Sequence, residues 1–273
     1  MPEGPEIRRA ADRIAGVLEG EILDDAAFAL PAMQGRESEF IGARVVSIEA
    51  RGKALLTHFE HGMTIYSHNQ LYGRWYVMKR DAYPNTGRSL RMALHTEKHS
   101  ALLYSASEIS IWSQSDLAMH PFLARLGPDI LSESLTWRDI VSRLENPRFE
   151  KRQVASLYLD QGFLAGVGNY LRSEILFDAK IDPQARPSDL SRKQKNELAR
   201  STLKVSKRSY SSAGLTNPPR RVAALKRKGL KRSAYRHAVF ARDNKPCYDC
   251  GEMVEKDLFG ARRLYWCPNC QAP

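Results

Sequence analysis

Residues 162–177 read G-F-L-A-G-V-G-N-Y-L-R-S-E-I-L-F, and this stretch decides how the middle of the chain is organised. Small residues dominate 162–168, where Gly162, Gly166 and Gly168 predict a tight turn. The residues on both sides of the turn, within 152–177, have the apolar spacing of helices. Two helices that meet at so tight a turn form a variant of the helix-turn-helix motif. Helical patterns dominate from about Gly127-Pro128 to Arg208, so we expect a helical middle region.

The region before Gly127 has a different pattern of apolar residues. Apolar residues recur at helical spacing between Pro5 and Gly20, which predicts one amphipathic helix with Gly20 as its C-terminal stop. Short β-type runs follow, separated by Gly, Asn, Asp and Pro, and together they predict a β-sandwich or barrel-like region. The expected strands are 43–50, 53–59, 63–68, 73–78, 90–94, 101–104 and 109–112.

All four cysteines lie near the end of the chain, as Cys247-x2-Cys250-x16-Cys267-x2-Cys270. This spacing is typical of a zinc ribbon, in which each C-x2-C turn directs two thiolates at one tetrahedral ion. Two disulfides or a redox C-x-x-C pair are the alternatives, and neither suits a cytosolic chain with two such turns. Four thiolates close the coordination shell, so we expect one structural Zn²⁺. The residues between the two turns then form a short β-hairpin.

Charge and hydropathy narrow the class of protein. The 273 residues include 42 Lys and Arg but 31 Asp and Glu, a formal charge of +11. Such an excess favours a polyanionic partner, and nucleic acid before anionic membranes or acidic proteins. No run of about 18 apolar residues predicts a membrane span, and the acidic, proline-broken start is unlike a secretory signal. We therefore expect a cytoplasmic protein.

The N-terminus offers a chemical group. Removal of Met1 would expose Pro2 as a secondary amine, which is far less protonated at neutral pH than a lysine. Glu3 adjoins this amine, and Glu6 lies one helical turn further on. A carboxylic acid beside a nucleophilic amine is an arrangement for covalent catalysis with general acid assistance. The alternative is that acids and proline simply favour the first helical turn. For Glu3 to act as a general acid, bound substrate would have to desolvate its carboxyl group.

Five motifs, spread from one end of the chain to the other, are similar to one family. They are P-E-G-P-E-I at the start, R-G-K-A-L-L-T-H-F at 51–59, Y-S-H-N-Q-L-Y-G at 66–73, F-L-A-G-V-G-N-Y-L-R-S-E-I-L at 163–176 and R-x-L-Y-W-C-P-N-C at 262–270. The chain resembles the formamidopyrimidine-DNA glycosylase and endonuclease VIII family, and most closely its bacterial endonuclease VIII branch. The resemblance implies an enzyme that excises a damaged base and then nicks the strand by β,δ-elimination.

The resemblance also assigns roles to single residues. It implies that Pro2 is the Schiff-base nucleophile and Glu3 the general acid, and that Lys53 holds a phosphate near the lesion. Asn169, at the start of the second turn-motif helix, and Arg262 in the zinc-ribbon hairpin would bind backbone phosphates. On composition alone, Lys53 is a surface lysine that begins a strand, and Asn169 is an ordinary helix cap.

Gln70, Leu71 and Tyr72 match the wedge with which endonuclease VIII fills the space left by an everted nucleotide. Because C1′ is shielded inside a stacked duplex, the chemistry requires eversion, and a wedge replaces part of the lost stacking. The triplet favours oxidised pyrimidines as substrates, since the formamidopyrimidine branch places its wedge residues on different loops. By composition alone, Leu71 and Tyr72 would suit the core of a strand.

The expected fold class is thus a multidomain α+β protein. An N-terminal helix with a β-sandwich forms residues 1–120, a helix-two-turn-helix domain 121–237 and a zinc-ribbon hairpin 238–273. We expect a monomeric DNA glycosylase and AP lyase of base excision repair that acts on damaged double-stranded DNA in the bacterial cytoplasm, associated with the nucleoid. Purine-directed excision of 8-oxoguanine or formamidopyrimidine, or a noncatalytic zinc-ribbon DNA-binding protein, are the alternatives.

The chain departs from the branch between about 207 and 241. Residues 220–237 contain eight Lys or Arg and no acids, and the sequence does not indicate whether this segment is ordered. Our hypothesis is that the segment adds nonspecific affinity for DNA, and a solvated loop is the alternative.

Overall fold

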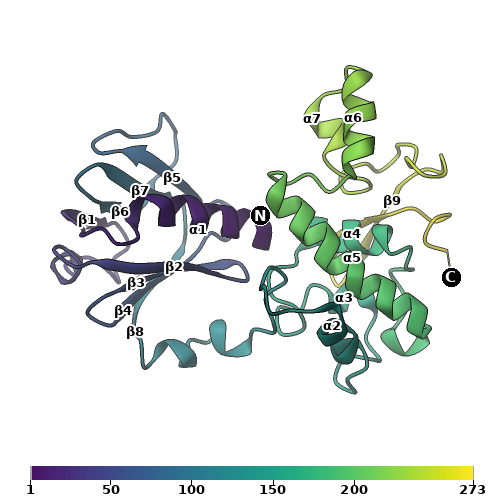
Figure 1. Ribbon diagram of the computed structural model, residues 1–273, viewed down its shortest axis with the longest axis horizontal. Helices are drawn as coiled ribbons and strands as arrows, with labels where there is room; N and C mark the ends of the chain where they lie inside the picture. The colour runs from purple at the N-terminus through teal and green to yellow at the C-terminus, as the bar shows by residue number, and fades with distance from the viewer. Residues whose placement is uncertain (1, 273) are drawn as a thin grey trace. The chain divides into compact units, whose positions relative to one another are not determined.

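Two units make up the computed structural model, which describes residues 2–272. The first extends over Met1–Arg125 and the second over Leu126–Pro273. The first contains a helix and two β-sheets, and the second contains helices and a C-terminal β-hairpin (Figure 1). The predicted fold class is therefore confirmed. No helix within 2–272 has both the length and the apolar character needed to span a membrane.

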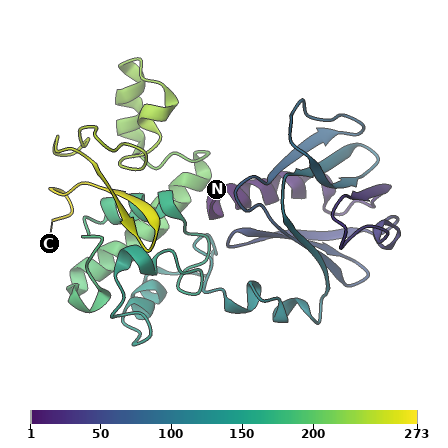
Figure 2. The same ribbon diagram turned by 180° about the vertical axis from the view of Figure 1, so that it is seen from behind.

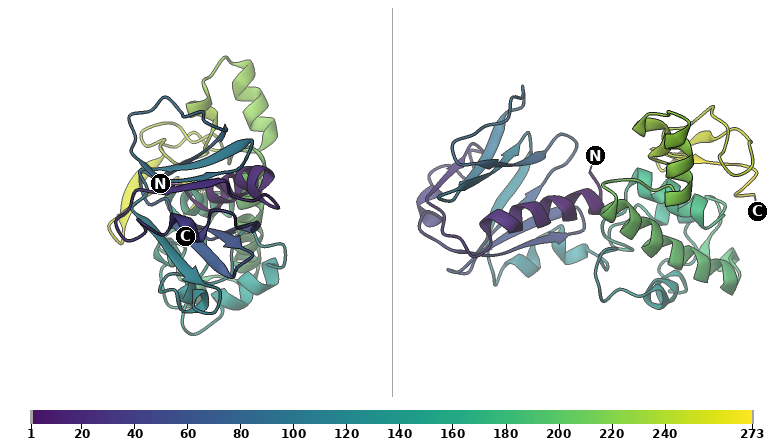
Figure 3. Two further views of the ribbon diagram at one scale, coloured as in Figure 1. Left: turned by 90° about the vertical axis from the view of Figure 1, so that its left-hand side faces the viewer. Right: turned by 45° about the horizontal axis from the view of Figure 1, so that its top comes forward.

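Helix α1, Gly4–Leu18, begins directly after Glu3 and has Pro5 in its first turn, where proline fits without loss of a hydrogen bond. One face of the helix, from Ile7 to Leu18, is buried in the core between the sheets. The helix contacts strands of both sheets, and Figure 3 shows it lying along the sandwich. It ends before Gly20, whose φ of 82° is a conformation that glycine adopts without strain.

The sandwich consists of two four-stranded antiparallel sheets, in the orders β1-β6-β7-β5 and β2-β3-β4-β8. The strands are β1 Asp25–Phe28, β2 Val45–Arg51, β3 Ala54–Phe59, β4 Met63–His68, β5 Arg74–Lys79, β6 Leu90–His95, β7 His99–Tyr104 and β8 Glu108–Ser113. Short 3-10 turns lie at Glu37–Glu39, Leu117–Met119 and Leu123–Arg125. The expected strands all form, and β1 is an additional strand that the sequence analysis missed.

The second unit is built around α4, Asn169–Asp178, in which every residue from Tyr170 to Phe177 is buried. The other helices are α2 Trp137–Leu144, α3 Val154–Leu157, α5 Arg192–Ser211, α6 Pro219–Arg227 and α7 Arg232–Tyr235, with a 3-10 turn at Pro187–Asp189. The predicted pair of helices around the glycine-rich turn is α3 and α4. The basic segment 220–237 is ordered and forms α6 and α7.

The C-terminal hairpin pairs β9, Glu255–Phe259, with β10, Arg262–Trp266. Leu264 of β10 is fully buried in the same core as α2, α4 and α5. Figure 2 shows the hairpin against the helices of this unit. The hairpin therefore packs on the helical part of the unit along β10, while its turn at Gly260 and Ala261 is exposed.

Candidate functional site

The start of α1 places a carboxylate next to Pro2. Glu3 is the N-cap of the helix and forms a capping box with Glu6, whose carboxylate accepts a hydrogen bond from the Glu3 backbone N–H at 3.1 Å. Glu6 also pairs with Arg9 at 3.1 Å. The Glu3 residue is only 3% exposed, which is unusual for an acid. The desolvation that we expected bound substrate to supply is thus already present in the protein. Met1 lies outside the described residues.

Lys53 lies in the two-residue turn between β2 and β3, after Gly52 with its φ of 62°. Its charge acts on His68, the last residue of β4. Burial lowers the pKa of His68, Glu108 opposes that shift, and Lys53 adds to it. His68 pairs in register with both Ala54 and Glu108, so the end of this sheet brings a lysine, a histidine and a carboxylate together.

The predicted wedge triplet lies in the tight turn between β4 and β5. The Gly73 N–H donates to the carbonyl of Asn69 at 2.7 Å, and a Cβ at Gly73 would lie 2.5 Å from that oxygen. Only glycine fits this turn. Leu71 is 58% exposed and Tyr72 is 69% exposed, so neither belongs to a strand core.

Gln70 differs from its two neighbours. Its φ of 48° is left-handed, and its side-chain amide donates to the carboxylate of Glu108. Its backbone N–H donates to Nδ1 of His68 at 3.1 Å, and Tyr66 donates to the other Glu108 oxygen at 3.3 Å. In this structure Gln70 is held to the sheet, whereas Leu71 and Tyr72 project from it. No pattern in the sequence indicated the part played by Glu108.

Asn169 is the first residue of α4, at the end of the glycine-rich turn. Gln161 holds this turn: its side chain donates to the carbonyl of Val167 at 2.9 Å and accepts from the N–H of Gly166 at 3.1 Å. Gly166 has a φ of 99°, where a side chain would be strained. The turn therefore fixes the N-terminus of α4, and the amides of a helix start favour anions.

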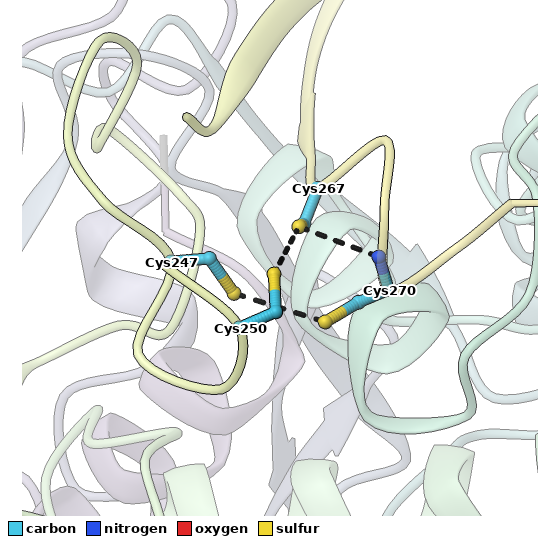
Figure 4. A group of neighbouring side chains, drawn as sticks. All are labelled: Cys247, Cys250, Cys267 and Cys270. Atoms are coloured by element: carbon cyan, nitrogen blue, oxygen red, sulfur yellow. Dashed lines mark hydrogen bonds between the residues drawn. The ribbon is translucent and has the colours of Figure 1, made fainter. Parts of the chain in front are cut away.

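The four cysteines come together as the spacing predicts (Figure 4). Their Sγ atoms all lie within 4.8 Å of one another, with 3.9 Å between Cys247 and Cys270 and 3.4 Å between Cys250 and Cys267. We call this group the four-cysteine site. Backbone N–H groups in both C-x2-C turns face cysteine sulfurs, for example Asp249 N–H at 3.4 Å from Cys247. The group could bind one metal ion, as in a zinc finger.

Two neighbouring residues of α4 hold the hairpin that carries Arg262. Arg172 is fully buried and donates to the carbonyls of Arg262 and Arg263 at 3.3 and 3.0 Å. The hydroxyl of Ser173 accepts from the Tyr265 N–H at 3.1 Å. The Arg262 side chain is exposed at the start of β10. Its position is therefore set by the hydrogen bonds that Arg172 makes to the backbone of Arg262 and Arg263.

The next residue of α4, Glu174, holds the segment that leads into the four-cysteine site. Its carboxylate is 2% exposed and accepts from the N–H groups of Ala238 and Val239 at 2.8 Å and of Phe240 at 2.9 Å. The Thr216 hydroxyl donates to the same group. Sequence reasoning missed Arg172 and Glu174. A charged residue within an apolar run indicates that it has a buried partner, but it does not indicate which segment of the chain supplies that partner.

The comparisons with known proteins agree with this architecture. Two family models match the chain, the formamidopyrimidine-DNA glycosylase N-terminal domain at residues 1–107 and the formamidopyrimidine-DNA glycosylase H2TH domain at residues 126–217. Endonuclease 8 of Escherichia coli O17:K52:H18 is 46% identical over 271 residues, covering 99% of this chain and 100% of that protein. The chain belongs to the formamidopyrimidine-DNA glycosylase family. Endonuclease 8 of Salmonella arizonae is 45% identical with the same coverage.

Solved structures of the family share the fold over the whole chain. The MutM (Fpg) protein from Thermus thermophilus has a TM-score of 0.79 at 27% identity, covering 99% of this chain and 98% of that one. A Lactococcus lactis formamidopyrimidine-DNA glycosylase bound to DNA with an AP site has a TM-score of 0.80 at 18% identity, covering 99% and 100%. Family membership makes this protein a bifunctional DNA glycosylase and AP lyase of base excision repair.

Proposed function

We propose that the protein removes oxidised pyrimidines from double-stranded DNA and then cleaves the strand by β,δ-elimination. The observation that carries the mechanism is the start of α1, where Pro2 directly precedes a carboxylate that is 3% exposed. The substrate class is supported by the exposed Leu71 and Tyr72 in the wedge turn, and by the similarity to proteins named Endonuclease 8. Damaged DNA as the partner agrees with the charge of +11.

In the first step, the unprotonated nitrogen of Pro2, freed by removal of Met1, attacks C1′ of the everted nucleotide. The bond from C1′ to the base breaks, and the base leaves with the electron pair and a proton from Glu3. The bond from C1′ to the ring oxygen then breaks, and this oxygen takes its electron pair and the proton that the Pro2 nitrogen loses. The product is an iminium ion between Pro2 and the opened sugar. The buried position of Glu3 directly after Pro2 keeps its carboxyl group beside the reacting nitrogen and away from bulk water.

In the second step, the iminium ion acidifies the protons on C2′. Loss of one of them expels the 3′ phosphate, and a further elimination expels the 5′ phosphate, which leaves a gap of one nucleotide with phosphorylated ends. We assign Lys53 to a phosphate next to the lesion, because its ammonium group lies at the end of the sheet that also bears the wedge turn. A fixed cation there stabilises the charge of the departing phosphate.

Leu71 and Tyr72 would enter the space that the everted nucleotide leaves. Both side chains project from a turn that Gly73 keeps short, so their insertion needs no rearrangement of the strands. Gln70 would face the orphaned base on the opposite strand after it leaves Glu108. Apolar wedges of this kind offset part of the stacking energy lost on eversion.

The backbone contacts would come from the N-terminus of α4 with Asn169 and from Arg262 on the hairpin. The four-cysteine site would hold one Zn²⁺ that keeps this hairpin folded. Four sulfurs at a Zn–S distance of about 2.3 Å in a tetrahedron lie about 3.8 Å apart. Two of the observed separations are 3.4 and 3.9 Å and all are within 4.8 Å, so small shifts of the side chains would accommodate that ion. The closed shell of thiolates makes the ion structural.

We further expect a monomer in the bacterial cytoplasm, associated with the nucleoid through DNA. The division into regions 1–120, 121–237 and 238–273 remains a prediction, as does the removal of Met1.

Borohydride trapping tests the mechanism. Protein of verified N-terminal mass is mixed with a duplex that contains thymine glycol, and reduction should link the two covalently through Pro2. The Glu3→Gln variant should lose release of thymine glycol but still be trapped on a preformed abasic site, because no base has to be expelled there. Trapping of a protein that retains Met1 would refute the role of Pro2. Equal rates on 8-oxoguanine and thymine glycol duplexes would refute the pyrimidine preference.

A further inference from the structure

The second unit contains a cationic projection that the proposed chemistry does not use. No Asp or Glu occurs between Glu197 and Asp243, and this acid-free stretch includes α6 and α7. The two helices stand out from the rest of their unit (Figure 1). Each of the residues Lys226, Arg227 and Lys228 at the end of α6 is exposed.

Two of the charges, Arg220 and Arg227, lie on the outer face of α6. Val222 and Leu225 are buried, whereas Arg220, Ala223 and Arg227 are exposed on the opposite face. Residues seven apart lie on the same side of a helix and about 10 Å apart along its axis. Ala223 lies between the two arginines, and its small side chain leaves room for a polyanion to approach the helix. Within residues 2–272, neither Arg220 nor Arg227 has an acidic side chain as an ion-pair partner.

The helix dipole accounts for only part of these charges. Lys226 and Arg227 lie in the last turn of α6, where cations are favourable, and Arg221 has an ion-pair partner in Asp249. Arg220, by contrast, lies in the first turn of α6, where a cation opposes the dipole. Neither helix contains an acid for an i,i+4 pair. An exposed cation in a position that weakens the isolated helix favours an external anionic partner.

The projection is nevertheless anchored, and its anchor lies in the first C-x2-C turn of the four-cysteine site. Arg221 forms an ion pair with Asp249, and the hydroxyl of Tyr248 donates to the carbonyl of Ala234 at 2.5 Å. The side chain of Asn217 donates to the carbonyl of Tyr235 at 3.0 Å, which ties the end of α7 to the start of α6. These contacts hold the exposed face in one position, which lowers the entropic cost of binding.

We propose that the outer face of α6 and the turn into α7 bind the phosphodiester backbone of duplex DNA without regard to sequence. This surface adds to the contacts assigned to Asn169 and Arg262 and is distinct from them in the chain. The identity of the polyanion rests on the proposed function, but the binding step does not depend on excision chemistry. The surface would keep the enzyme on undamaged DNA between lesions.

The test is the salt dependence of binding to an undamaged 30-base-pair duplex, compared between two double variants. Arg220→Gln/Arg227→Gln removes two charges from the proposed surface. Arg192→Gln/Lys193→Gln removes two exposed charges from the start of α5 and serves as the matched control. Each phosphate contact contributes about 0.9 to the slope of log K against log salt, so the first variant should lower the slope by up to about 1.8.

Between 50 and 200 mM salt, that change means that the wild type loses about tenfold more affinity than the Arg220/Arg227 variant. The control should keep the wild-type slope, and Arg220→Lys/Arg227→Lys should keep it too, since charge is preserved. Bound zinc and circular dichroism verify folding of each variant. An unchanged slope in the glutamine variant, or an equal fall in the control, would overturn the proposal. Borohydride trapping is measured separately, so a failure of the excision mechanism leaves this result interpretable.

Discussion

Glu174→Gln is the sharpest test of how the helical unit holds the four-cysteine region. The substitution keeps the size of the side chain, so it changes hydrogen bonding without opening a cavity. One glutamine oxygen still accepts from Val239 and Phe240, but the other carboxylate oxygen becomes an NH2 group that faces the N–H of Ala238. The Thr216 hydroxyl, which donates to that same carboxylate oxygen, can rotate and accept from the new NH2 group. The Ala238 N–H cannot, so two donors oppose each other in a site that is 2% exposed.

The magnitude follows from these contacts. A buried N–H left without an acceptor costs about 1–3 kcal/mol, and a bond to a neutral acceptor contributes about 1 kcal/mol less than a bond to a carboxylate. One lost and two weakened bonds give about 3–5 kcal/mol. An amide is less costly to bury than a carboxylate, which offsets part of this, so we expect a net loss of about 2–4 kcal/mol.

For a unit of this size, that loss lowers the melting temperature by about 5–12 °C. Differential scanning calorimetry of the zinc-loaded protein measures it, and amide hydrogen exchange should rise at 238–240. Glu133→Gln is the matched control, because Glu133 is an exposed acid in the same unit. A melting temperature within about 2 °C of the control would refute the reasoning that the Glu174 charge holds this segment.

Three further predictions concern other parts of the molecule. Gly73→Ala should slow excision at least tenfold, because a Cβ would lie 2.5 Å from the Asn69 carbonyl and displace the wedge turn that bears Leu71 and Tyr72. Single-turnover kinetics on thymine glycol measure the rate, and wild-type rates would contradict the prediction. Burial lowers the pKa of both His68 and His120 below the ordinary value of 6.5, so the unfolded state takes up protons first and the free energy of unfolding should fall as pH drops below about 6.5 towards the folded pKa values. Urea unfolding at pH 7.5 and 5.5 measures this fall. The fall should be smaller in a His68→Asn/His120→Asn variant, and an equal fall in that variant would show that the two histidines do not cause it. Chelation of zinc should increase hydrogen exchange in α6 and α7, which are anchored to the first C-x2-C turn, and unchanged exchange there would show that the anchor does not depend on the metal.

The elements with strong local patterns could be predicted from the sequence. Amphipathic spacing marks α1, and runs of β-branched and aromatic residues mark the strands from β2 to β8. Strand β1 was missed because Asp25-Ala26-Ala27-Phe28 has little intrinsic preference for a strand. It forms because the chain pairs with β6 at the edge of the sheet, a contact between segments about 65 residues apart.

The candidate site shows the same limit. Cysteine spacing is a local signal, and it predicts the four-cysteine site fully. The part of Glu108 in holding Gln70 depends on a pairing of β4 with β8 that residue patterns alone do not reveal. The order of 220–237 could not be predicted either, because an acid-free basic segment has the composition of a solvated loop. Its contacts with Tyr248, Asp249 and Asn217, which lie outside the segment, hold it in place.

The way in which α4 holds the hairpin has a consequence for how that hairpin can vary. Arg172 and Ser173 donate to and accept from main-chain atoms of β10, namely two carbonyl oxygens and one amide. These hydrogen bonds do not depend on which side chains stand at the exposed positions of the strand. The outward-facing residues of the hairpin can therefore be substituted, in evolution or by design, while the hairpin stays docked on the helices. Affinity for a partner and structural stability are thus separable properties of this hairpin.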